Sequence, residues 1–296
     1  GSVPEDGEHQ SPEVVQEWNG QEDRCEPLLQ ERDGSARLLD TPVQVTALAS
    51  FPRSGNTWVR IFLQELTGVK SGSLYDDALV PPPLERVPGT ERVYVVKTHD
   101  VSLSYTKRAA ASPPSREVGV FRKVIWVVRN PFDCIWSRIQ KVHSKSFTGS
   151  LSDLPDDAWE IFEASLEEWR RHSLYWISVL KGNKASNLFV RYEELVAHPA
   201  EEFRRIVEFL PIDVDEERFT CLVAEATCSH RPESCRSGRI GEGLQRLLLL
   251  DEPGRRRSSK TVRESALGMN DLLAVFGYHV TDDGRLAVGD PQLYYR

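Results

Sequence analysis

Residues 51–60 read Phe-Pro-Arg-Ser-Gly-Asn-Thr-Trp-Val-Arg and directly follow an apolar run at residues 43–49. This order is typical of a buried strand, a tight turn and the first turn of a helix. Such a turn directs several backbone N–H groups at one point, and the helix dipole adds positive potential there. The stretch therefore predicts an anion site, most often one for phosphate.

The same stretch lacks the features of a nucleoside triphosphate loop. The pattern G-x-x-x-x-G-K-[ST] is absent, since only one Gly is present, no Lys follows it and no Ser or Thr is placed to hold Mg²⁺. We expect the phosphate to be held by Arg53 and by backbone groups, without a metal, although an ordinary loop and helix cap would read similarly. The residues expected to add backbone donors are Ser54, Gly55, Asn56, Thr57 and Trp58. Thr57 also offers a hydroxyl, and the ring of Trp58 could contact the adenine of a nucleotide.

The composition fits one globular domain with a tail. The chain has 296 residues, is 40% apolar and 28% charged, and carries a net charge of −8. That charge disfavours nucleic acid and anionic membranes as partners, so local basic residues must hold an anionic ligand. Residues 1–40 are acidic and lack apolar periodicity, which predicts a flexible tail or stem before a domain at residues 41–296. No run of eighteen apolar residues occurs.

The cysteines give little indication of the compartment. They are five in number, Cys25, Cys134, Cys221, Cys228 and Cys235. An odd count at low density does not indicate a disulfide framework, and the spacing does not indicate a zinc site. Cys228 and Cys235 flank a Pro-containing loop and could pair or stay free, whereas Cys134 is expected to be a buried thiol. The opening Gly-Ser is typical of a cloning remnant, so an anchor could have preceded residue 1. The sequence therefore leaves two compartments open, the cytoplasm, or the Golgi lumen if there was such an anchor.

Strands and helices are expected to alternate along the chain. Strands are predicted at residues 43–51, 93–96, 123–128 and 187–190, and helices at 57–66, 132–143, 157–180, 199–209 and 265–276. Residues 107–117, 144–157 and 226–243 are expected to be loops, the second of them over the site. The alternation predicts an α/β fold with a P-loop-like, doubly wound parallel sheet flanked by helices in a single domain. Ligands of such sheets bind at the carboxyl ends of the strands.

A Lys-Thr-His sequence follows the strand at residues 93–96. An imidazole is suited to accept a hydroxyl proton, so His99 is a candidate general base. Lys97 would stabilise charge on a leaving oxygen. A single histidine after a strand is usually structural, but its combination with the loop at Arg53 favours catalysis.

The pattern Arg-x-Pro-x-Asp-x-x-x-Ser follows the strand at residues 123–128. Arg129 lies at the strand end, and Ser137 lies on the following helix within its reach. An arginine with a hydroxyl binds phosphate strongly. Asp133 is expected to be a carboxylate at the helix N-terminus. The sequence therefore predicts a second anchor for phosphate.

Together these motifs resemble those of sulfotransferases that use 3′-phosphoadenosine-5′-phosphosulfate (PAPS). The resemblance implies that the loop at residues 51–60 binds the 5′-phosphosulfate and that Arg129 and Ser137 bind the 3′-phosphate. It also implies that His99 acts as the general base beside Lys97 and Arg53, and that the product is 3′,5′-adenosine bisphosphate (PAP). No metal is implied.

Three further positions follow from the resemblance. Residues 236–243 read Arg-Ser-Gly-Arg-Ile-Gly-Glu-Gly and are similar to the R-K-G-x-x-G-D-W loop of the family, with its Lys, Asp and Trp replaced. Arg236 and the backbone at Gly238 are thereby implied at the 3′-phosphate, with a solvated basic loop as the alternative. Tyr192 and Thr227 match positions that contact adenine in the family, although either could simply pack.

The acceptor is indicated only as a class. Residues 49–52, 55–60, 67–68 and 72–73 look most like the WSC-domain-containing sulfotransferases, which act on glycans, notably sialic acid, in the Golgi. The Lys-Thr-His sequence is also typical of cytosolic sulfotransferases, which act on phenols and alcohols. The resemblance thus implies a hydroxyl on a glycan or a small molecule. Thr261-Val262 is similar to a short dimerisation motif of the cytosolic members, which weakly indicates a homodimer.

Two alternatives remain beside a sulfotransferase. One is a nucleotide enzyme of kinase type, which is disfavoured by the missing lysine of the triphosphate loop. The other is a non-catalytic nucleotide-binding protein of the same fold, which the presence of Arg53, Lys97 and His99 disfavours.

Overall fold

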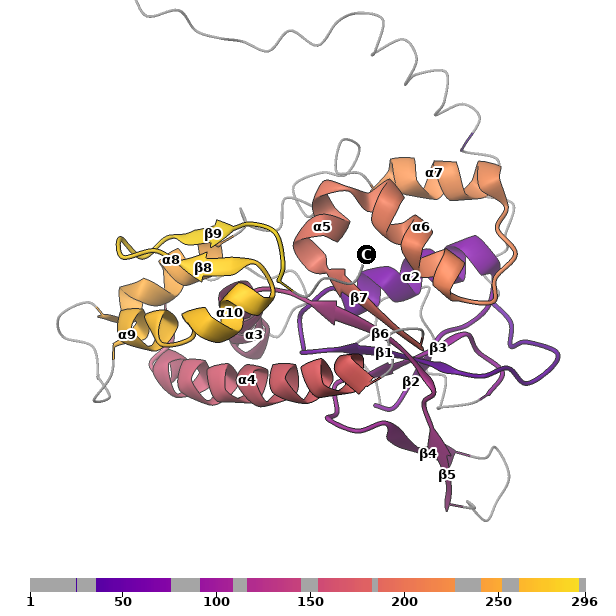
Figure 1. The fold of residues 1–296 in the computed structure, drawn as a ribbon, viewed down its shortest axis with the longest axis horizontal. Coiled ribbons are helices and arrows are strands. Elements are labelled where there is room, and N and C mark those ends of the chain that lie inside the picture. The colour runs from indigo at the N-terminus through magenta and orange to yellow at the C-terminus, as the bar shows by residue number, and fades with distance from the viewer. Residues whose placement is uncertain are drawn as a thin grey trace, which may run out of the picture.

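The computed structural model describes residues 25, 36–75, 91–108, 116–144, 154–182, 186–226, 241–251 and 261–292. In this part of the chain a five-stranded sheet with the order β2-β3-β1-β6-β7 forms the centre of the fold (Figure 1). Every neighbouring pair is parallel, which confirms the predicted doubly wound α/β sheet. The strands are β1 (Thr46–Ser50), β2 (Gly72–Ser73), β3 (Val95–Thr98), β6 (Lys123–Val128) and β7 (Asn187–Arg191).

Helices cover both faces of this sheet (Figure 1). Along β1, Leu48 packs into one hydrophobic cluster while Ala47 and Ala49 pack into the other, because successive side chains point to opposite faces. Burial of both faces explains why the strand sequences are almost continuously apolar. The first face is covered by α2 (Asn56–Thr67), α5 (Tyr192–Ala197), α6 (Pro199–Phe209) and α7 (Glu216–Ala226). The second is covered by α3 (Pro131–Ser144), α4 (Ala158–Gly182), α8 (Glu242–Leu248), α9 (Val262–Leu267) and α10 (Asn270–Val275).

The tryptophans of the long helix α4 belong to the core. Trp169 and Trp176 are almost fully buried, and Trp159 is buried as well. They pack with strand residues of the second face, including Trp126 on β6. In the described part of the chain, none of the helices combines the length and the hydrophobicity of a membrane-spanning segment.

The predicted loop at residues 107–117 is wrong at its two ends. Strands β4 (Ser104–Arg108) and β5 (Arg116–Val120) pair antiparallel and project from the sheet (Figure 1). Sequence patterns reveal a hairpin through apolar alternation, and these strands contain mostly polar and basic residues. The Pro/Ser-rich signal for a turn falls between them, at residues 109–115, which lie outside the described part.

The C-terminal region is more divided than the single predicted helix at residues 265–276. A new helix, α10, begins at Asn270. The Asn270 side chain binds the backbone of Val280, donating to its oxygen at 2.9 Å and accepting from its nitrogen at 2.8 Å. Gly277 ends α10 with φ +78°, as expected for a C-terminal glycine. The sequence did not predict β2, α7, α8, the short η2 (Leu249–Asp251), or the antiparallel pair β8 (Tyr278–Val280) and β9 (Leu286–Val288).

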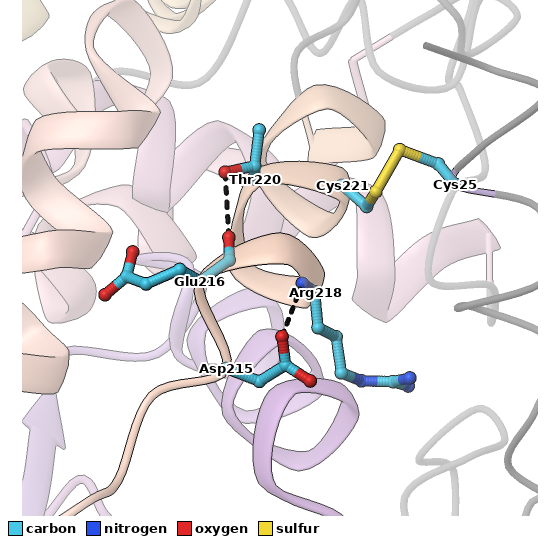
Figure 2. The surroundings of a disulfide bond; sticks show 6 residues. All are labelled: Cys25, Asp215, Glu216, Arg218, Thr220 and Cys221. Atoms are coloured by element: carbon cyan, nitrogen blue, oxygen red, sulfur yellow. Dashed lines mark hydrogen bonds between the residues drawn. A yellow bond between two sulfur atoms is a disulfide. The ribbon is translucent and has the colours of Figure 1, made fainter.

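A disulfide joins Cys25 to Cys221 on α7, across a sequence separation of 196 residues (Figure 2). The sequence analysis did not predict this bond. Cys25 and Cys221 are far apart in the sequence, and only the folded chain brings them together. Cys134 is a free, buried thiol, as predicted. Cys228 and Cys235 lie outside the described residues. Arg37 also pairs with Val69, so the segment before residue 41 contacts the domain.

Candidate functional site

The carboxyl ends of four parallel strands meet at one edge of the sheet. The register pairs Ala49 with Thr98 and Val128 with Arg191, so the strands end at similar heights. The residues that follow are the ones singled out in the sequence: the loop at 51–55 after β1, His99 after β3, Arg129 after β6 and Tyr192 after β7. Parallel sheets bind their ligands at this edge.

The loop between β1 and α2 has a specific backbone shape. Arg53 has φ +70° and Gly55 has φ +92°, both in the left-handed region. A side chain at Gly55 would place its Cβ 2.5 Å from Cδ2 of Tyr192, so the loop lies directly against that ring. Asn56 at the start of α2 donates from Nδ2 to the Leu48 oxygen at 2.8 Å, which fixes the helix to β1. The loop is thus restrained by the Tyr192 ring on one side and by the bond from Asn56 to β1 on the other.

The two predicted phosphate anchors contact each other. Arg129 donates from Nη1 to the backbone oxygen of Arg53 at 3.2 Å, and Arg53 donates from Nε to Oγ of Ser137 at 2.8 Å. The sequence placed Ser137 with Arg129, whereas here its hydroxyl binds the other arginine. The reason is that the left-handed turn at Arg53 brings its side chain over α3, on which Ser137 lies.

The charges of this pair suit an anion. Burial and the nearby charge of Arg129 both lower the pKa of Arg53. Burial also opposes the charge on Arg129, but Tyr192, Cys134 and neighbouring carboxylates outweigh it and raise its pKa. The Arg129 guanidinium lies 4.5 Å from the centre of the Tyr192 ring, and its buried Nε has no hydrogen-bond partner among the described residues. Two adjacent guanidinium groups and a buried donor fit a ligand with several phosphate oxygens.

His99 is held in one tautomer by the end of β1. Its Nδ1 lies 2.6 Å from the backbone oxygen of Ser50. A carbonyl oxygen can only accept, so Nδ1 carries the hydrogen and Nε2 carries the lone pair of the neutral ring. The arrangement leaves Nε2 as the basic atom, which is the requirement for a general base.

Lys97 and Trp58 take different positions in the site. Lys97 is half-buried on β3, with Nζ 5.8 Å from the centre of the Tyr75 ring. Trp58 packs edge-on against Tyr192 and against Phe203 in the core, at centroid distances of 6.2 and 5.4 Å. Its indole therefore supports Tyr192 from the α2 side. Ser54 and Asn56 are buried, and Gly55 and Thr57 are half-buried.

A buried histidine near His99 was missed by the sequence reasoning. His172 on α4 accepts a hydrogen bond from Nε1 of Trp176 at 3.1 Å. Burial, with a smaller effect of His99, lowers the pKa of His172 to about 3, so its ring is neutral at physiological pH. His172 lies between Trp169 and Trp176 on α4, and this position in the sequence indicates a core residue without indicating a site residue.

A buried polar network supports the site from behind. The carboxylate of Glu193 accepts from the backbone nitrogen of Asn130 at 3.1 Å and from the hydroxyl of Tyr278 at 2.5 Å. Asp133 accepts from the backbone nitrogens of Gly241 and Gly243 at 3.0 and 2.8 Å. The predicted helix carboxylate thus also attaches the start of α8 to α3. Thr227, Arg236 and Gly238 lie outside the described residues, and their roles remain predictions.

Comparisons with known proteins agree with these observations. A family model described as the sulfotransferase domain matches residues 45–231. The WSCD family member GA21586 of Drosophila pseudoobscura pseudoobscura is 35% identical over 202 residues, which cover 64% of this chain and 58% of the relative. Cytosolic sulfotransferase 16 of Arabidopsis thaliana is 28% identical over 193 residues, which cover 60% of this chain and 56% of that protein.

The matches cover part of each relative. The chain spans 58% of the length of the first of these relatives. Among solved structures, mouse sulfotransferase SULT7A1 complexed with PAP aligns with a TM-score of 0.46 at 18% identity, covering 84% of this chain and 88% of that one.

Proposed function

The chain belongs to the sulfotransferase domain family, and from this premise we propose that it transfers a sulfuryl group from PAPS to a hydroxyl of an acceptor. The observation that carries the proposal is the direct contact of the two basic anchors, through the 3.2 Å bond from Arg129 to the Arg53 oxygen. A bisphosphorylated nucleotide presents phosphate groups at both ends of one adenosine. Adjacent arginines beside an aromatic ring suit such a ligand.

PAPS would supply an activated sulfuryl group on its 5′-phosphate. In the proposed site, residues 53–58 and the Arg53 guanidinium hold the 5′ end, and Arg129 holds the 3′-phosphate beside the Tyr192 ring. Ser137 takes part through its bond to Arg53. Thr227, Arg236 and Gly238 complete the nucleotide contacts in this proposal by their match to the family motifs.

His99 is proposed to remove the proton of the acceptor hydroxyl. Its Nε2 accepts the proton while Nδ1–H stays bonded to the Ser50 oxygen, so the ring keeps its orientation as it becomes charged. Lys97 is proposed to stabilise negative charge on the departing oxygen. General-base catalysis of this kind contributes about 10²–10⁴-fold to a rate.

The acceptor is proposed to be a hydroxyl of a glycan or of a small alcohol or phenol. The Cys25–Cys221 disulfide favours an oxidising compartment such as the Golgi lumen over the cytoplasm. A homodimer through residues 261–262 is disfavoured, because Val262 is fully buried in the core and Thr261 caps α9 with its side chain.

The proposal is tested with sulfur-labelled PAPS and a panel of glycans, phenols and alcohols. We expect the wild-type chain to label at least one acceptor class, and His99→Ala to lose about 10²–10⁴-fold in turnover while still binding PAP. His279→Ala is the matched control, since His279 is exposed on β8. Near-wild-type turnover of His99→Ala would remove His99 from the role of base.

The same assay separates the alternatives. Phosphoryl transfer from ATP–Mg²⁺ without use of PAPS would favour an enzyme of kinase type. Tight binding of PAP with no transfer to any acceptor in the panel would favour a non-catalytic nucleotide-binding protein.

A further inference from the structure

Tyr75 lies beside two candidate catalytic residues, Lys97 on β3 and His99 just after it, although no sequence motif marks Tyr75. Strand β2 pairs in parallel with β3, with Ser73 opposite Lys97. The ladder continues one step further, because the Leu74 nitrogen donates to the Lys97 oxygen at 3.1 Å. Two residues after Ser73, the chain therefore reaches the position alongside His99. The register of a short edge strand thus places Tyr75 at the site.

The hydroxyl of Tyr75 is fixed by two hydrogen bonds whose directions are forced. It donates to Oδ1 of Asp100 at 2.8 Å, since a carboxylate can only accept. It accepts from the backbone nitrogen of His99 at 2.7 Å. Burial is the main cause that raises the pKa of Tyr75 well above its ordinary value, so the phenol keeps its hydrogen at any physiological pH. The hydroxyl thereby binds the backbone of His99 just beyond the end of β3.

The ring of Tyr75 restrains the imidazole as well. The two rings are stacked, with centroids 5.3 Å apart and planes 24° from parallel. The bond from Nδ1 to the Ser50 oxygen alone would still let the imidazole tilt about that contact. A stacked ring on one face removes this freedom. The Nζ of Lys97 lies 5.8 Å from the centre of the same ring, so one side chain contacts both residues.

We propose that Tyr75 is a positioning residue for His99, which sets the backbone of His99 through its hydroxyl and the plane of the imidazole through its ring. This inference rests on the proposed function, in which His99 is the base. Catalytic groups act efficiently only within a narrow range of positions, so a small tilt of the imidazole reduces turnover without affecting cofactor binding. The effect should therefore appear in kcat and not in the affinity for PAP.

Tyr75→Phe removes the hydroxyl and keeps the ring. We expect kcat to fall about 10–100-fold, with the affinity for PAP and the melting temperature nearly unchanged. Tyr94→Phe is the matched control, because Tyr94 precedes β3 and packs against the hydrophobic cluster under α2, α5, α6 and α7. Asp100→Asn keeps an acceptor oxygen for Tyr75 and should keep most of the activity. Wild-type kcat in Tyr75→Phe would overturn the inference.

A double-mutant cycle distinguishes positioning from a general structural role. If Tyr75 acts through His99, Tyr75→Phe should leave the residual rate of His99→Ala unchanged. An equal loss in both backgrounds would show that Tyr75 supports the fold and not the base, and would refute the proposal.

A spectroscopic measurement tests Tyr75 without turnover. In ¹⁵N-histidine NMR spectra of the whole chain, we expect His99 to appear as the Nδ1–H tautomer in the wild type and in Tyr94→Phe. In Tyr75→Phe the His99 ring signals should shift or broaden. Unchanged His99 signals in Tyr75→Phe would contradict the positioning role of Tyr75, whether or not the chain turns over PAPS. Absence of PAPS turnover in the wild type would instead contradict the proposed function.

Discussion

The Cys25–Cys221 disulfide gives a stability prediction whose size follows from its position in the sequence. The bond joins residues 196 apart, so in the unfolded chain it closes a very long loop. The chain-entropy relation then gives an upper bound of about 5 kcal/mol at 25 °C, and measured values for native disulfides span about 2–5 kcal/mol. We expect the Cys25→Ser/Cys221→Ser variant to unfold with a free energy lower by about 2–5 kcal/mol, which for a chain of this length corresponds to about 3–10 °C in melting temperature.

The assay is urea unfolding with and without a phosphine reductant. Reduction should lower the midpoint of the wild type and leave the double serine variant unchanged, which serves as the control. Hydrogen exchange should locate the effect, because Cys221 lies on α7 (Figure 2). Its neighbours in sequence, Phe219 and Leu222, belong to the core. Amides of Glu216–Ala226 should exchange faster after reduction. An identical midpoint before and after reduction would refute the reasoning.

Three further predictions concern the site and its support. Gly55→Ala should weaken PAP binding and cost about 1–3 kcal/mol of stability, measured by calorimetry and thermal melting, because φ is +92° and the new Cβ would meet Tyr192. Tyr278→Phe should cost about 1–3 kcal/mol in urea unfolding, since the buried Glu193 loses a donor. The pKa of His172 is lowered to about 3 in the folded state, whereas in the unfolded chain it is near 6.5. Between these two pH values the imidazole is protonated in the unfolded chain and neutral in the folded one, so acid favours unfolding. Stability should fall by about 2 kcal/mol from pH 7 to pH 5, and His172→Phe should flatten this dependence.

Local sequence patterns were sufficient to predict those parts of the site that directly follow a single strand. The loop at residues 51–60 predicts its strand, turn and helix because Gly55 and the apolar run are adjacent in sequence. Arg129 and His99 each follow a strong apolar strand, and the parallel fold places all such ends at one edge. Their meeting therefore follows from fold class alone.

Contacts between distant segments were not predictable in the same way. Ser137 was assigned to Arg129, because sequence spacing cannot show which way the Arg53 side chain turns. Tyr75 reaches His99 only through the register of β2, which is two residues long and carries no apolar pattern. The partner of Cys25 depends on the placement of α7, a helix that the sequence did not reveal.

Isothermal titration with PAP is the most direct measurement of the central claim, that Arg53 and Arg129 hold one bisphosphorylated nucleotide. We predict saturable binding by the wild type and a loss of about 10–100-fold in Arg129→Met, which corresponds to the roughly 1.5–3 kcal/mol of charge-assisted hydrogen bonds. Arg170→Met, at an arginine paired with Glu167 on the surface, should bind as the wild type does. Absence of PAP binding by the wild type, or equal affinity in Arg129→Met, would contradict the account.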